Sequence, residues 1–328
     1  IASLCKSQSA AFETMAVQLA QADDTLRRLG ELELGQLAMQ LATGEGAIIF
    51  SPTRAMMIPA SLIFPKSGIV QETTAIDQRF RGEQIISSAM RSLQSSVQPT
   101  VVFVHAEESS LLTRRQNNVD LWAAKGLLET SRFRVAQWIP YEGPRPGLPD
   151  GPVVWVVIPP SSRAGLTTSP REQALIDATI GLLAGNEAVM INIQPSLLPR
   201  YGQKDPWAQL VKDIGIEVDT ERVLVEQVAI GPNQIEVRRS QMIGDMHSEH
   251  IIANGVSGRQ IFLPFPMNVK GGEELIVIET TEDHWLDAKW ERDIVEPSSE
   301  TNVIEKVQVA AAIEHHGGAR AIVIGSGG

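Results

Sequence analysis

Short runs of continuous apolar residues alternate with amphipathic segments through the middle of this 328-residue chain. A run that is apolar throughout, rather than at every second residue, is typical of a strand buried on both faces of a parallel sheet. Helices between such strands cover those faces. We therefore predict a doubly wound, three-layer, mostly parallel α/β domain. Its strands are expected at residues 101–105, 134–138, 153–158 and 188–193, and its helices at residues 119–130 and 170–184.

Two of the expected helices carry start signals. Ser169 is placed to cap the first, with Pro170 at the first helical position and Glu172 at the capping-box position. Asp205 and Pro206 repeat the pattern for a helix that runs to residue 214, where Gly215 can adopt the left-handed conformation that ends a helix.

The N-terminal residues 1–78 are predicted to form a separate small α/β unit. A helix is expected at residues 7–28, with Phe12, Met15 and Leu19 on one face, and a second helix at residues 32–41. That apolar face would suit packing on its own domain or on a neighbouring chain. Strands are expected at residues 47–50 and 61–64.

Residues 79–328 are predicted to form the larger domain, which begins with a helix at residues 82–96 and becomes rich in strands from residue 222. Residues 240–260 and 290–302 are polar enough to be long surface loops. The later strands are expected near residues 223–228, 235–237, 261–263, 275–279, 307–313 and 321–324.

The net charge of −11 argues against a nucleic-acid partner and against binding to an anionic membrane surface. Residues 201–328 hold 21 acidic and 11 basic side chains, so most of the excess acid lies there. This excess indicates either a solvated surface or an acidic docking face.

A single cysteine, Cys5, excludes an internal disulfide and a cysteine-rich zinc site. The longest apolar stretch, residues 153–158, is far shorter than the roughly 20 residues that cross a bilayer. No GxSxG elbow or phosphate-binding glycine motif with a following helix occurs, and we expect no cofactor and no metal.

Ligands of open α/β sheets bind beyond the carboxyl ends of the strands, so the polar residues there are candidates for a ligand or partner rim. His105 could act as a base beside a carboxylate, which leaves open a hydrolase or amidotransferase-like activity of His105 and Glu107. The candidate rim residues are His105, Glu107, Glu108, Ser161, Ser162, Gln194 and His250.

The order of these segments resembles the GldG-like auxiliary proteins of ABC-type transport systems. The family has an F-x-G-E helix that leads into a strand ending in a His-Gly-Glu turn, which matches residues 79–90 and 101–107 here. Further similar blocks are residues 127–135, the strand at 153–158, the Ser-Pro-Arg-Glu helix start, residues 207–215, the turn at 249–252 and the closing strand at 319–325. This chain differs from the family pattern at Val104, Ala106, Ile251 and the Ser326-Gly327 pair.

The resemblance implies a core of the class I glutamine amidotransferase-like, or flavodoxin-like, kind without its catalytic cysteine, a relation shared with an intraflagellar transport domain. It also implies a non-enzymatic, extracytoplasmic (periplasmic) domain that is tethered to the inner membrane by flanking transmembrane helices outside this sequence. Its implied partners are an ABC permease and ATPase, and a homo-oligomer is compatible with it. The alternatives left open are the enzyme described above and a free-standing binding protein for a small molecule or carbohydrate.

Overall fold

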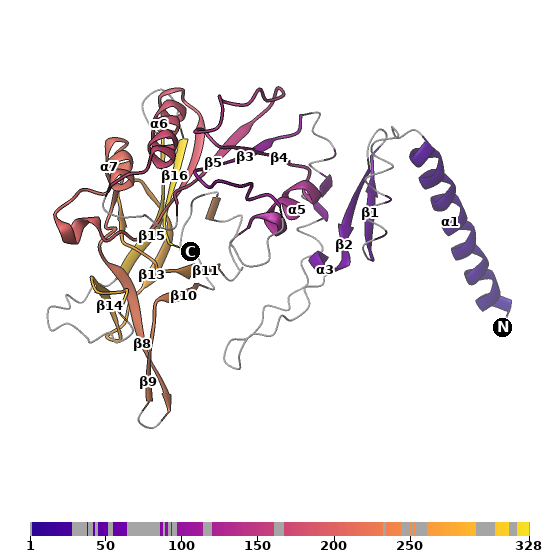
Figure 1. The fold of residues 1–328 in the computed structure, drawn as a ribbon. Helices are drawn as coiled ribbons and strands as arrows, with labels where there is room; N and C mark the ends of the chain where they lie inside the picture. Colours follow the sequence, from indigo (N-terminus) through magenta and orange to yellow (C-terminus); the bar gives the residue numbers. More distant parts are fainter. Residues whose placement is uncertain are drawn as a thin grey trace. The chain divides into compact units, whose positions relative to one another are not determined.

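In the computed structural model, the chain divides into two compact units (Figure 1). One unit comprises Ile1–Gln98 and Ala123–Phe133, and the other Pro99–Trp122 and Arg134–Gly328. Residues 79–98, which the sequence assigned to the larger domain, therefore cluster with the N-terminal unit. The described residues are 2–27, 38, 42, 45–51, 55–63, 86, 87, 89, 90, 93, 97–113, 120–160, 167–231, 234–243, 250, 252–253, 261–292, 306–314 and 320–327.

The larger unit is built on a seven-stranded mixed sheet, which confirms an α/β fold with a large sheet and few helices. The strand order is β13-β15-β16-β6-β5-β3-β4, and the four pairings from β16 to β4 are parallel. The two pairings at the other edge are antiparallel. The strands are β3 (Thr100–His105), β4 (Arg134–Trp138), β5 (Val153–Ile158), β6 (Ala188–Ile193), β13 (Glu273–Glu279), β15 (Lys306–Glu314) and β16 (Arg320–Gly325).

Strand β3 marks the point in the sheet at which the order of the strands reverses. The next strand, β4, pairs on one side of β3, and β5 then pairs on the other side. All six residues of β3 are buried, as its continuous apolar run predicts. The strand order reverses between β3 and β5, and such a reversal opens a crevice at the carboxyl ends of the two strands.

Helices α6 (Pro170–Ala184) and α7 (Pro206–Asp213) pack on one face of this sheet. The apolar core there joins Leu175 and Leu182 of α6 and Val211 of α7 to Trp155 and Ile191 on the strands. Both predicted N-caps are confirmed. The Ser169 hydroxyl accepts from the Glu172 amide at 3.1 Å, and the Asp205 carboxylate accepts from two amides of α7.

Glu172 has a further role that its capping-box position does not predict. Its side chain is 1% exposed, and its Oε1 accepts a hydrogen bond from the Trp207 indole at 2.9 Å. Because a buried carboxylate requires hydrogen-bond partners, this contact ties the start of α6 to the start of α7. Gly215, with φ +92°, follows α7 in the left-handed region, as predicted.

The strand-rich part after α7 forms three small sheets beside the large one. Strand β8 (Val223–Gly231) pairs with β14 (His284–Asp287) and β9 (Gln234–Arg238), β10 (Ser240–Ile243) with β11 (Ile261–Pro264), and β7 (Glu217–Val218) with β12 (Val269–Lys270). A 3-10 helix η1 (Leu198–Tyr201) follows β6. A second apolar core lies under β13 and β15 and includes Leu224, Leu263 and Ile276.

The predicted loop at residues 240–260 is wrong at its start, because residues 240–243 are strand β10. Gln241 and Ile243 are buried there while Met242 is exposed, which is the alternation of a strand with one covered face. The polar side chains Ser240 and Gln241 conceal that pattern in the sequence. Most of the remaining loop residues lie outside the described residues.

In the N-terminal unit, helix α1 (Ala2–Arg27) and strand β1 (Gly46–Phe50) confirm the predicted helix and first strand. Phe12, Met15 and Leu19 of α1 are all more than half exposed. Among the described positions of the predicted helix at residues 82–96, Ala89 and Leu93 are helical and pack on the β1–β2 hairpin. The predicted helix at residues 32–41 falls almost wholly outside the described residues.

The strand predicted at residues 61–64 is wrong. The partner of β1 is β2 (Ala55–Pro59), and Ala60–Ile63 is the short helix α3. Met56, Met57 and Ile58 bury their side chains in β2, so the hairpin is complete before the apolar run at residues 60–63 begins. The amide of Ala60 donates to the carbonyl of Glu45 at 2.7 Å and closes the hairpin at that point.

The caps make a prediction for stability. Replacement of Asp205 by alanine removes the acceptor for two amides and should lower the free energy of unfolding by about 1–2 kcal/mol. Asp213 lies at the other end of α7, where an acidic group opposes the helix dipole and does not stabilise the helix. Its replacement by alanine should therefore change the free energy of unfolding by less than about 0.5 kcal/mol. Urea unfolding of both variants measures the difference, and equal losses would contradict the capping role of Asp205.

Candidate ligand and partner rim

The candidate site lies at the carboxyl ends of β3, β4 and β5, where the strand order reverses. His105 ends β3 and pairs in register with Ile158, the last residue of β5. The loop that follows β3 begins with Ala106, Glu107 and Glu108. The N-terminus of α6 reaches the same place, as its contacts with this loop show.

His105 does not face a substrate crevice. Its side chain is fully buried, and the neighbouring Ala106 is 7% exposed. Glu107 is half-buried and Glu108 is exposed, so the chain emerges from the core over these two residues. The imidazole and the two carboxylates, which the sequence places side by side, therefore lie in different environments.

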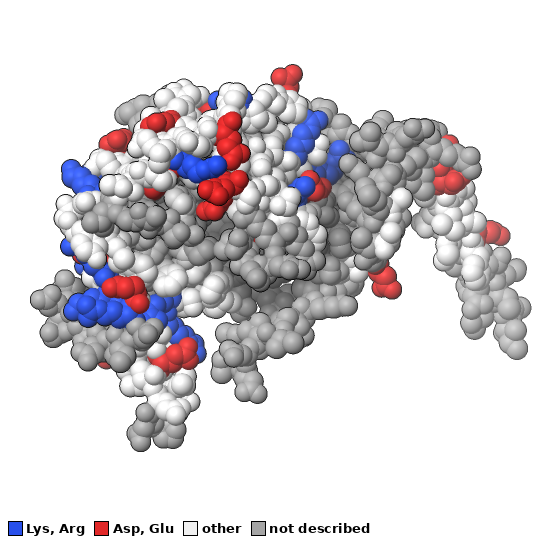
Figure 2. All heavy atoms as spheres, in the orientation of Figure 1, with Lys and Arg blue, Asp and Glu red and all other residues white. Residues whose placement is uncertain are grey.

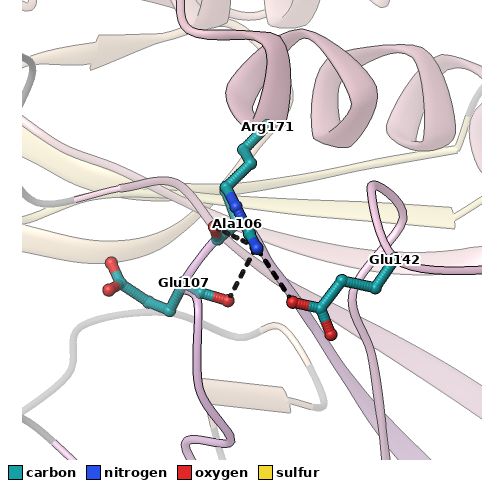
Figure 3. A network of polar contacts seen from close by, with 4 residues as sticks. All are labelled: Ala106, Glu107, Glu142 and Arg171. Carbon is teal, nitrogen blue, oxygen red and sulfur yellow. Dashed lines mark hydrogen bonds and ion pairs between the residues drawn. The ribbon is translucent and has the colours of Figure 1, made fainter.

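Arg171, the second residue of α6, joins the loops that follow β3 and β4 (Figure 3). Its Nη1 donates to the carbonyl oxygens of Ala106 at 3.5 Å and Glu107 at 3.4 Å. Its Nη2 donates to Oε1 of Glu142 at 2.9 Å. The guanidinium carbon also lies 5.0 Å from the centre of the Tyr141 ring, a cation–π distance. We call this group the Arg171 clamp.

The Arg171 clamp contacts the backbone of the loop after β3 and leaves the Glu107 carboxylate out of these contacts. Figure 3 shows that the Glu107 side chain points away from Arg171, whereas its backbone carbonyl faces the guanidinium. Arg171 thus holds the carbonyl oxygens of the loop, and the Glu107 carboxylate takes no part in the clamp. Glu107 is half-buried and Glu108 is exposed, so the loop carries two carboxylates that are at least partly accessible to solvent.

Sequence reasoning overlooked Arg171 and Glu142 as site residues, although a signal for Arg171 was present. The Ser169-Pro170 start fixes the first turn of α6, and helices of doubly wound folds begin at the carboxyl edge of the sheet. Residue 171 must then lie near the rim. No comparable signal exists for Glu142, which lies in a turn after β4.

Gln194 lies at the same edge of the sheet but is not part of the Arg171 clamp. Its Nε2 donates to the carbonyl of Pro159 at 3.4 Å, so it links the ends of β6 and β5. Ser161 and Ser162, predicted rim residues that follow Pro159, lie outside the described residues.

His250 is not brought to the His105 end of the sheet. Its Nε2 lies 3.6 Å from Oε2 of Glu273, the first residue of β13, and its Nδ1 accepts from the Ile252 amide at 3.2 Å. Strand β13 is five places from β3 in the sheet, a lateral separation of about 24 Å. The candidate rim therefore includes Glu107 and Glu108, with Gln194 farther along the same edge. His105 is buried at the end of β3, and His250 lies elsewhere.

A second charged and aromatic cluster, also absent from the predictions, surrounds Glu187. Its carboxylate pairs with Arg145 and accepts from the Trp155 indole at 3.3 Å. The Arg145 guanidinium lies 4.5 Å from the Trp155 ring, and Trp138 packs edge-on against the same ring. Both carboxylate oxygens are thus hydrogen-bonded within the protein, which is the pattern of a structural contact.

The described part of the chain contains no cluster of three or more His, Cys, Asp or Glu side chains that could hold a metal ion. No helix among the described residues is long and apolar enough to cross a membrane. On the face drawn in Figure 2, acidic and basic side chains are interspersed.

Comparisons with known proteins add little to this geometry. No family model matches the chain, and no curated protein matches it. A solved structure described as "mmIFT52 N-terminal domain" is similar over 69% of this chain and 85% of its own, at 13% identity and a TM-score of 0.38. A likeness at that score carries no argument about function.

The clamp predicts a local effect on dynamics. Replacement of Arg171 by alanine removes three hydrogen bonds and should raise amide hydrogen exchange in the loops after β3 and β4 about fivefold, which corresponds to about 1 kcal/mol. The estimate is modest because Arg171 and Glu142 are partly exposed.

Arg320 gives a matched control, since it pairs with Glu314 at the amino end of β16. Its replacement by alanine should leave exchange in both loops unchanged. Exchange mass spectrometry in which neither variant alters the two loops would contradict the clamp.

Proposed function

We propose that this chain is a non-enzymatic interaction domain of an ABC-type transport system of the gliding-type export kind. In this proposal it works at the extracytoplasmic, periplasmic face of the inner membrane beside the permease and ATPase subunits. The sequence resemblance to GldG-like auxiliary proteins supports the assignment. The finer fold we propose is a glutamine amidotransferase-like core that has no nucleophilic cysteine.

The observation that carries the proposal is the loop after β3. Arg171 contacts its backbone, the Glu107 side chain points away from Arg171 (Figure 3), and Glu108 is exposed beside it. A rigid loop with exposed charges recognises a partner at low entropic cost, because little ordering remains to be done on binding. This arrangement suits a docking surface for a basic segment of a transporter subunit.

The sheet topology supports the proposed core. Its five parallel strands have the order of doubly wound folds, with a reversal between β3 and β5, and α6 and α7 cover one face. Function in such folds depends on the residues at the strand ends rather than on the fold itself.

The burial of His105 favours an interaction domain over an enzyme that uses His105 and Glu107. A general base must reach the proton that it removes, directly or through one water. His105 is 0% exposed, whereas Glu107 is half-buried and its side chain points away from Arg171 (Figure 3). The two side chains therefore lack the shared access that acid–base catalysis needs.

The proposal is tested by purification of the tagged full-length protein from detergent-solubilised membranes. We expect a permease and an ATPase of the ABC type in stoichiometric amounts. The double variant Glu107→Lys/Glu108→Lys should lose both subunits, because two charges at the docking loop are reversed. The variant Glu314→Lys, which reverses an exposed charge at the amino edge of the sheet, should retain them.

Two results would contradict the proposal. One is recovery of the wild-type protein in the soluble fraction with no transporter subunit, which would favour a free-standing binding protein. The other is equal recovery of the subunits by the loop variant and the wild type, which would exclude the loop as the docking surface.

A further inference from the structure

Arg200 lies in η1, which follows β6 at the carboxyl edge of the sheet. Its Nη1 forms an ion pair with Oε1 of Glu291, in the turn after β14. The side chain is only 21% exposed, so the guanidinium is held largely inside the protein. The proposed transporter function does not use this residue.

The rest of the guanidinium has no acceptor. Nε and Nη2 of Arg200 are both buried, and neither has a hydrogen-bond partner among the described residues. These two nitrogens lie on the same edge of the guanidinium, and their N–H bonds point in parallel. That edge matches two oxygens of one carboxylate or phosphoryl group. Since buried donors are nearly always paired, an unpaired bidentate edge calls for an acceptor such as a bound water or an anion.

Arg239 and Trp290 also carry buried donors that have no partner among the described residues. Nη2 of Arg239 donates to the carbonyl of Arg292, next to Glu291, while its buried Nε has no partner among the described residues. The buried Nε1 of Trp290 also lacks one within the described chain. The Trp290 ring packs edge-on against Phe265 at 5.6 Å, and the Phe265 amide donates to the Arg239 carbonyl at 2.7 Å. The unpaired donors thus belong to Arg200, Arg239 and Trp290. Both arginines contact the turn that contains Trp290, through Glu291 and Arg292.

The local charge favours an anion. Burial acts to raise the pKa of Glu291, yet the hydrogen bond from Arg200 and the charges of Arg200 and Arg292 lower it below its usual value. Arg200 and Arg292 therefore both lie close enough to Glu291 to stabilise its charged form. Figure 2 shows several Lys and Arg side chains, with Asp and Glu side chains among them, where β8 and β14 lie.

We propose that the Nε/Nη2 edge of Arg200, with Arg239 and Trp290 beside it, binds an oxyanion: the carboxylate or phosphoryl group of a small ligand. The two N–H groups of the edge hold two oxygens of the anion. Glu291 positions the guanidinium from its other side. This site is separate from the Glu107–Glu108 loop and does not depend on the transporter proposal.

Inorganic phosphate and malonate are the probes, each titrated into the full chain by calorimetry at constant ionic strength. We expect saturable binding of at least one of them at a single site, with a Kd of about 1 mM or tighter. The stronger probe identifies a phosphoryl or a carboxylate ligand. Arg200→Lys keeps the charge but removes the bidentate edge, and should weaken binding about ten- to hundredfold.

Two further variants complete the test. Arg320→Lys makes the same change at the amino edge of β16 and should bind like the wild type. Arg239→Lys should weaken binding by a smaller factor, and it provides the comparison if circular dichroism shows that Arg200→Lys is not folded. The proposal is wrong if the wild type shows no saturable binding of either probe, or if both Arg200→Lys and Arg239→Lys bind with unchanged affinity.

Discussion

The burial of β3 on both faces determines how the rest of the larger unit is arranged. All six of its residues are buried, so neighbouring strands must pair on each side and other elements must cover each face. Strand β4 takes one side and β5 the other, and the strand order reverses at this point. The rim is a consequence of that reversal, because the loops diverge where the two strands end.

Helix α6 couples this rim to the core through three consecutive residues. Pro170 follows the Ser169 cap and fixes the first turn, Arg171 holds the loops after β3 and β4, and Glu172 accepts from the Trp207 indole in the interior. One helix start thus sets the geometry of the surface and the packing of α7. The same helix start therefore holds the backbone of the loop that carries Glu107 and Glu108.

Much of the sheet was predictable from sequence because its signals are local. Continuous apolar runs located the central strands, and Ser169, Asp205 and Gly215 located the helix ends. Strand β10 was missed because polar residues interrupt its apolar pattern. Strand β2 is apolar throughout, but it ends at Pro59 and is defined by its pairing with β1 rather than by an alternating pattern. The burial of His105, the position of His250 beside Glu273, and the contacts of Arg171 and Arg200 all depend on residues distant in sequence. No local pattern contains that information.

We propose that the loop after β3 contacts a transporter subunit. Photo-crosslinking in intact membranes tests this contact, with a photoreactive amino acid placed at position 108 or, as a control, at position 314 on the opposite edge of the sheet. We expect a cross-link to the ABC permease from position 108 and none from position 314. No permease cross-link from position 108, or equal yields from both positions, would contradict it.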